Sequence, residues 1–201
     1  MRKLTLDNNC LIALEQGEEP TATALRDLIA AHNVRAVTLR VVCVSGFERP
    51  QGEARIPFIE EFYARLRRIG LDGAEVLSSI VYLDMDTRLD SGFILGSDED
   101  FAFEQWIHHT LFPDDGDGTW EGYCAARRAW DAPRRERAWK NHKRDVLTLW
   151  SHIFHAGDIF LTTDGNFFKA TKKQSLIDRG AAAIMRPAEA VQCLRQQGVV
   201  A

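Results

Sequence analysis

Apolar residues recur along the chain in two patterns, one typical of buried strands and one typical of amphipathic helices. Short continuous apolar runs predict strands of a parallel sheet, because such strands are covered on both faces. We expect strands at residues 3–6, 36–44, 158–163 and 182–185, and a strand or short apolar helix at 75–83. Apolar residues three or four positions apart predict helices. We expect helices at residues 8–16, 21–31, 57–69, 104–111, 138–155, 170–179 and 187–197.

The alternation of strands and helices predicts an α/β fold with a mostly parallel central sheet flanked by helices. A chain of 201 residues has the length of one ordinary domain, so we expect a single domain over residues 1–201. The alternation is interrupted at residues 84–137, which we interpret as an insertion. Within it, we expect residues 84–100 and 113–122 to form mostly loops.

Composition and hydropathy narrow the cellular context. No stretch approaches the roughly 18 apolar residues that a membrane helix requires, so we expect no membrane partner. The four cysteines, at positions 10, 43, 124 and 193, are scattered and form no CxxC pair. This spacing favours neither a zinc site nor a disulfide framework, and it predicts a reduced, cytoplasmic environment.

Two blocks of opposite charge underlie the mild net charge of −4. Residues 84–121 contain eleven acidic side chains and one basic side chain, whereas residues 127–144 contain eight basic and two acidic ones. Trp130 and Trp139 lie within the basic block, and such interleaving suits single-stranded nucleic acid. The alternative is a helix that pairs with the acidic block and buries its tryptophans. On the first interpretation, the residues contacting RNA are Arg134, Arg135, Arg137, Lys140, Lys143 and Arg144.

Acidic residues follow three of the predicted strands. Asp7 and Asp164 come directly after strands, Glu48 comes shortly after the strand at 36–44, and Asp145 lies in the helix at 138–155. Because parallel strands end at one edge of a sheet, we expect these carboxylates to meet in one cleft. Clustered carboxylates repel one another unless a cation neutralises them, and oxygen ligands favour Mg²⁺ or Mn²⁺. Such a cation would polarise a phosphoryl oxygen and activate water.

Four short segments resemble the PIN-domain nucleases. Residues 4–12, Leu-Thr-Leu-Asp-Asn-Asn-Cys-Leu-Ile, resemble the opening motif of that family, and residues 45–48, Ser-Gly-Phe-Glu, resemble its second acidic motif. Residues 145–150, Asp-Val-Leu-Thr-Leu-Trp, and 158–167, Asp-Ile-Phe-Leu-Thr-Thr-Asp-Gly-Asn-Phe, resemble its closing pair. The matches cover residues 3–48 and about 140–190, in the family's order.

The resemblance implies a three-layer α/β fold and a metal-dependent ribonuclease, often the toxin of a toxin–antitoxin pair. It implies an RNA substrate and a protein antitoxin or regulator as a partner. A homodimer is a separate expectation. The metal ligands and catalytic residues would be Asp7, Glu48, Asp145 and Asp164, supported by Ser45, Thr162 and Asn166. Lys169 would stabilise charge on the phosphoryl oxygens. Asn166 stands where many relatives carry another acid.

Two other functions remain open. Residues 80–87, Ile-Val-Tyr-Leu-Asp-Met-Asp-Thr, resemble the nucleophile loop of haloacid-dehalogenase-type phosphatases. In that case Asp84 would attack phosphate and Asp86 would act as acid and base. The second alternative is a non-catalytic module that binds RNA or a protein partner through the basic block and needs no metal.

Overall fold

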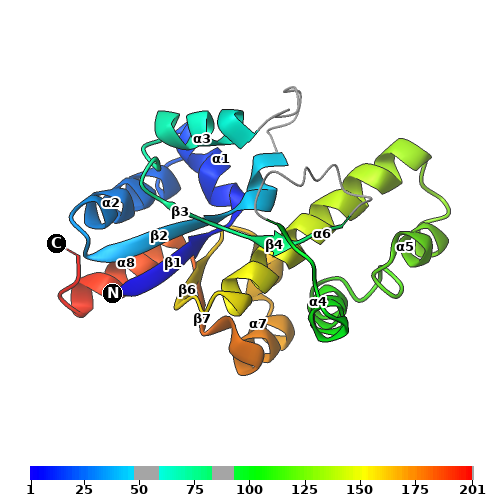
Figure 1. Cartoon of the computed structure of the whole chain (residues 1–201). Coiled ribbons are helices and arrows are strands. Elements are labelled where there is room, and N and C mark those ends of the chain that lie inside the picture. Colours follow the sequence, from blue (N-terminus) through cyan, green and yellow to red (C-terminus); the bar gives the residue numbers. More distant parts are fainter. Residues whose placement is uncertain (48–58, 83–92, 201) are drawn as a thin grey trace.

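The computed structural model describes residues 1–47, 59–82 and 93–200. Its centre is a five-stranded, all-parallel sheet with the order β3-β2-β1-β6-β7 (Figure 1). The strands are β1 (Arg2–Leu6), β2 (Val37–Val42), β3 (Glu75–Leu77), β6 (Ile159–Leu161) and β7 (Ala183–Met185). Leu6 of β1 lies opposite both Val41 and Leu161, so the three inner strands end at the same level. The residues that follow them therefore share one edge of the sheet.

Helices and short turns connect and cover these strands. The helices are α1 (Asn8–Gln16), α2 (Thr21–Asn33), α3 (Ile59–Arg68), α4 (Asp98–Leu111), α5 (Trp120–Ala126), α6 (Ala132–Phe154), α7 (Ala170–Leu176) and α8 (Pro187–Gln196). Short helical turns are η1 (Cys43–Phe47), η3 (Gly165–Phe168) and η4 (Ile177–Ala181). A separate two-stranded parallel ribbon consists of β4 (Ser79–Ile80) and β5 (Phe93–Ile94).

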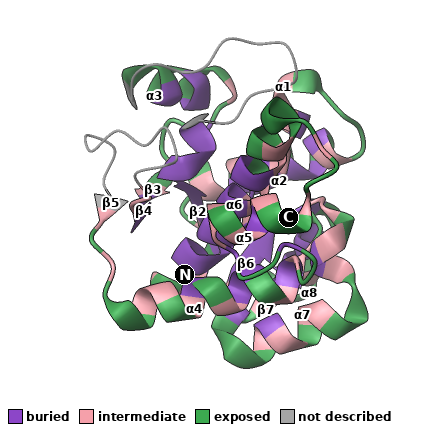
Figure 2. Ribbon diagram, turned by 90° about the vertical axis from the view of Figure 1, so that its right-hand side faces the viewer, coloured by how far each residue is buried: buried purple, intermediate pink, exposed green. Residues whose placement is uncertain are grey.

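The sheet is covered on both faces, so the fold has three layers (Figures 1 and 2). Leu4 and Leu6 of β1 belong to a core that α1, α2, α3 and α8 complete. Phe160 of β6 belongs to a second core, which includes Trp150 of α6 and residues of α4 and α7. Strand residues alternate between the two faces, and this alternation places successive side chains in different cores. The predicted α/β class with a parallel sheet between helices is confirmed.

The polar segment before residue 104 is less irregular than expected. The helix α4 begins at Asp98, six residues earlier than the apolar periodicity predicted. Its start is a capping box, in which Ser97 and Asp100 each accept a hydrogen bond from the other's backbone. Acidic residues in the first turn also interact favourably with the helix dipole. The prediction of loop over residues 84–100 is therefore wrong for residues 98–100, and residues 83–92 lie outside the described part.

The helix α6 likewise begins at Ala132 rather than at residue 138. Asp131 caps it by accepting a hydrogen bond from the Arg134 backbone at 2.8 Å. Within the described part of the chain, every helix is too short or too polar to cross a membrane.

Candidate functional site

Asp7 is fixed at the junction of β1 and α1. Its backbone nitrogen extends the sheet by donating to the carbonyl of Leu161 at 2.9 Å, and its side chain caps α1 by accepting from Asn8 N at 2.8 Å. The second carboxylate oxygen, Oδ2, accepts from the Asn9 amide at 3.2 Å and from the Thr162 hydroxyl at 2.7 Å. Asp7 is only 1% exposed. These donors orient the buried carboxylate.

Thr162 connects Asp7 to Asp164. It directly follows β6, is fully buried, and accepts a hydrogen bond from Asp164 N at 3.0 Å through the same hydroxyl that donates to Asp7. One carboxylate oxygen of Asp164, Oδ1, accepts from Asn166 N at 2.8 Å and so caps η3. The sheet thus places the Thr162 hydroxyl between the Asp7 carboxylate and the backbone of Asp164, while the meeting of the two carboxylates stays a prediction.

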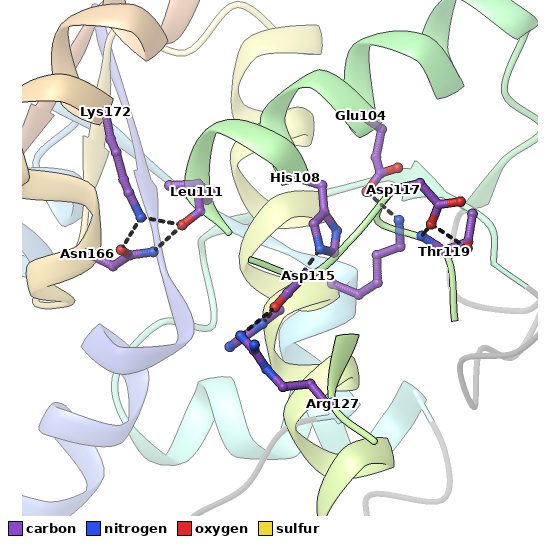
Figure 3. Close-up of polar contacts among 11 residues, drawn as sticks. Glu104, His108, Leu111, Asp115, Asp117, Thr119, Arg127, Asn166 and Lys172 are labelled. Carbon is purple, nitrogen blue, oxygen red and sulfur yellow. Dashed lines mark hydrogen bonds and ion pairs between the residues drawn. The ribbon is translucent and has the colours of Figure 1, made fainter. Parts of the chain in front are cut away.

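Asn166 and Lys172 extend this site toward the end of α4 (Figure 3). The Asn166 amide donates to the carbonyl of Leu111 at 3.1 Å. The Lys172 ammonium donates to the Asn166 carbonyl oxygen at 2.7 Å and also to Leu111 O. Burial and the neighbouring Lys169 lower the pKa of Lys172, against the opposing effect of Asp114 and Asp164. The Lys172 side chain is anchored on Asn166, two residues after Asp164.

Lys172 was missed by the sequence reasoning, which proposed Lys169. Lys169 is exposed and precedes the first turn of α7, whereas Lys172 lies one helical turn further on and faces the site. Residues three apart share a helix face, so the position of Lys169 was the only signal that pointed to Lys172.

Asp145 lies in α6, seven residues before His152. Two turns further along α6, the His152 imidazole contacts the Thr5 hydroxyl of β1 at 2.9 Å. Because α6 runs back toward the start of β6, Asp145 is displaced from His152 by about 10 Å toward the carboxyl ends of the strands. The side chain of Asp145 is partly exposed.

The predicted cluster of metal ligands stays a prediction. Among the described residues, no three His, Cys, Asp or Glu side chains lie close enough together to hold a metal ion. Asp145 therefore does not complete a three-carboxylate group with Asp7 and Asp164. Glu48 lies outside the described residues, as do Asp84 and Asp86 of the phosphatase alternative.

The donors that are visible fit a hard cation. Asp7 and Asp164 offer only oxygen atoms, which Mg²⁺ and Mn²⁺ prefer. Ser45, in η1 at the end of β2, is 1% exposed, and its hydroxyl has no hydrogen-bond partner among the described residues. Arg65 ties Ser45 to this region by donating to Ser45 O at 3.1 Å and to the Asn8 side chain at 3.3 Å. An unsatisfied buried hydroxyl at this edge is a further available oxygen.

The basic block is divided between the surface and the interior. Lys143 is 2% exposed and pairs with the fully buried Glu104 at 2.8 Å, which also accepts from the Tyr82 hydroxyl at 2.6 Å. Lys140 and Arg144 are also buried, and Lys140 pairs with Glu136 at 2.7 Å. The expectation that these three residues contact RNA does not agree with their burial.

The outer part of the block remains available to a ligand. Arg134 and Arg137 are exposed, and Arg135 is partly buried. The Arg134 guanidinium lies 4.2 Å from the centre of the Trp130 ring. An exposed cation stacked on an aromatic ring is the arrangement expected of a surface that binds single-stranded nucleic acid.

Comparison with known proteins adds no family. No protein-family model matches the chain, and no curated protein matches it. The function is therefore argued from the geometry of the site and from the chemistry of its residues.

Proposed function

We propose that this protein is a metal-dependent nuclease that hydrolyses phosphodiester bonds, with RNA as its substrate. The observation that carries the proposal is the bridge through Thr162, which joins the buried Asp7 carboxylate to Asp164 where β1 and β6 end. Ligands of parallel α/β sheets bind at this edge. The resemblance of the surrounding residues to PIN-domain nucleases supports the same chemistry.

The metal would be held by Asp7 and Asp164, with Asp145 and Glu48 as the further carboxylates. Bound Mg²⁺ or Mn²⁺ supplies polarisation of a phosphoryl oxygen and acidifies water. Thr162 keeps Asp7 in one orientation, and its burial protects that hydrogen bond from competition with solvent. The ammonium groups of Lys172 and Lys169 would offset the negative charge that develops on the phosphoryl oxygens.

The substrate strand would reach the site along the exposed start of α6. Arg134 and Arg137 would contact phosphates, and Trp130 would offer a ring for base stacking. RNA binding, a protein antitoxin or regulator, a homodimer and a cytoplasmic location remain predictions from the resemblance and the composition.

The test is cleavage of an RNA panel in Mg²⁺ or Mn²⁺ by the purified Asp7→Asn and Asp164→Asn variants. Both should lose cleavage, because each substitution removes a negative ligand while preserving its shape. The matched control is Asp72→Asn, which changes an exposed aspartate outside the site. Undiminished cleavage by both site variants would remove the proposal. Tight RNA binding without heat from Mn²⁺ in calorimetry would support the non-catalytic alternative.

A further inference from the structure

A second group of polar residues lies beneath the loop between α4 and α5. Asp115 is 1% exposed and interacts with three cationic or potentially cationic side chains (Figure 3). One carboxylate oxygen contacts His108 Nε2 at 3.2 Å and His142 Nδ1 at 2.6 Å. The other accepts from Arg127 at 3.3 Å. The proposed nuclease chemistry assigns no role to this group.

The loop is built so that Asp115 points inward. Asp117 accepts from the Thr119 backbone at 2.9 Å and from its hydroxyl at 2.6 Å, and the Thr119 hydroxyl caps α5 by accepting from Gly122 N at 3.1 Å. Gly116 has a φ of 76°, and a Cβ there would lie 2.8 Å from the carbonyl oxygen of Gly122. Gly116 and Gly122 therefore allow the loop to close tightly over the Asp115 carboxylate.

The hydrogen bonds to Asp115 favour its charged form. Burial by itself would raise the pKa of Asp115, but its bonds to His108 and His142 lower it to about 2, so the carboxylate is ionised at neutral pH. His108 is 1% exposed, and its Nδ1 has no partner in the described part of the chain. His108 therefore contacts the carboxylate through Nε2 alone.

His142 is the more exposed of the two imidazoles. Its ring stacks on Phe112 with centroids 3.8 Å apart, while Nδ1 is fixed on Asp115. Because Nδ1 faces the carboxylate, Nε2 on the opposite edge of the ring is directed away from it. The side chain is 28% exposed. A carboxylate that holds one nitrogen and leaves the other available is the arrangement that orients a histidine for proton transfer.

Two structural connections lead from His142 toward the candidate nuclease site. Along α6, His142 precedes Asp145 by three residues, so the two side chains lie about 5–6 Å apart at Cβ on one helix face. Through the end of α4, Asn166 bonds to Leu111 O, and the next residue, Phe112, stacks on His142. Phe112 thus connects the imidazole to the contact between Leu111 and Asn166, two residues after Asp164.

We infer that His142 is the proton donor to the leaving oxygen in the proposed phosphodiester hydrolysis, and that Asp115 is its positioning residue. This inference rests on the proposed nuclease function. Water forms the new bond to phosphorus and passes its proton to solvent. The bond from phosphorus to the leaving oxygen breaks, that oxygen takes the proton from His142 Nε2, and the imidazole regains a proton from solvent.

The decisive experiment compares two substrates that differ in their leaving group. His142→Gln should reduce kcat on an RNA dinucleotide by about 100-fold or more, the usual contribution of a general acid. It should reduce kcat on a p-nitrophenyl phosphodiester far less, because a nitrophenolate leaves without a proton. Asp115→Asn should show the same selective loss, since it weakens the orientation of the ring. An equal loss on both substrates would overturn the inference, because a structural defect does not distinguish leaving groups.

The matched control is His109→Gln, which alters an exposed histidine one residue from His108. A readout that needs neither metal nor turnover is the ring ¹⁵N spectrum. It should show His142 protonated at Nδ1 when neutral, with an Nε2 resonance that shifts on adding a phosphorothioate dinucleotide, and no such shift for His109. An unchanged His142 spectrum would also overturn the inference. If the wild type cleaves neither substrate, the proposed function itself fails, whereas activity that needs Asp7 but not His142 refutes only the present inference.

Discussion

Thr162 donates its hydroxyl proton to Asp7 across 2.7 Å, although 155 positions separate the two residues in the chain. The contact exists because β1 and β6 are neighbours and end at the same level. It couples the stability of the sheet edge to the orientation of the carboxylate on which the proposed activity depends. A change at Thr162 should therefore affect both.

Thr162→Val should lower the free energy of unfolding by about 1–3 kcal/mol, because it leaves the buried Asp7 carboxylate without one donor and Asp164 N without its acceptor. It should also reduce RNA cleavage, since Asp7 loses its fixed orientation. Urea denaturation and cleavage assays would measure the two effects. Thr163→Val is the control, because it makes the same change at the next, partly exposed position. Equal effects of both substitutions would contradict the role assigned to Thr162.

Much of this edge of the sheet could be predicted from the sequence. Apolar runs that end abruptly in Asp7 and in Thr162-Thr-Asp164 mark strand ends, and parallel strands bring such ends together. The position of Asp7 and Asp164 at one edge of the sheet therefore follows from local pattern and topology. The position of Asp145 was less certain, because a helix residue is placed by the packing of the whole helix.

The interior polar groups were not predicted, for a physical reason. Lys143 lies three, four and seven residues before Val146, Leu147 and Trp150, on the buried face of α6, so its position indicated burial. Its charge suggested a surface residue, and nothing local identifies Glu104 as its partner. The Asp115–His142 pair has the same origin, since loop closure brings together residues from two helices and a turn.

Lys143→Met should destabilise the fold by about 3–5 kcal/mol, because it leaves the buried Glu104 carboxylate without its counterion. The double variant Lys143→Met with Glu104→Leu should regain much of this loss, since replacing a buried pair by apolar groups is often nearly neutral. Chemical denaturation of the single and double variants measures the coupling. Additive losses would show that the pair contributes no mutual stabilisation.

His152 should make stability depend on pH between about 6.5 and 4. Its ring is buried against Thr5 and the carbonyl of Ala181, and this burial lowers its pKa to about 4. Between pH 6.5 and 4 this histidine is protonated in the unfolded chain but not in the folded chain. The free energy of unfolding therefore decreases as the pH falls through this window. The maximum loss from this group is about 3 kcal/mol.

Denaturant unfolding at a series of pH values would measure this dependence, and His152→Gln should flatten it between pH 6.5 and 4. His109→Gln, at an exposed position, should leave it unchanged. The lowered pKa of Asp115 contributes in a separate window, below about pH 4, so it does not obscure the result. An unaltered slope in His152→Gln would show that another group dominates.

RNA affinity should depend on the exposed part of the basic block and not on its buried part. Arg134→Gln and Arg137→Gln should each weaken binding uniformly across sequences and reduce the dependence of log K on log salt by about one counterion. Lys140→Gln is the matched control, because Lys140 is buried and pairs with Glu136. Binding measured at several salt concentrations by fluorescence anisotropy separates the two groups. If the Lys140 variant changes the salt dependence as much as the arginine variants, the strand does not follow the exposed start of α6, and the proposed path of the substrate is wrong.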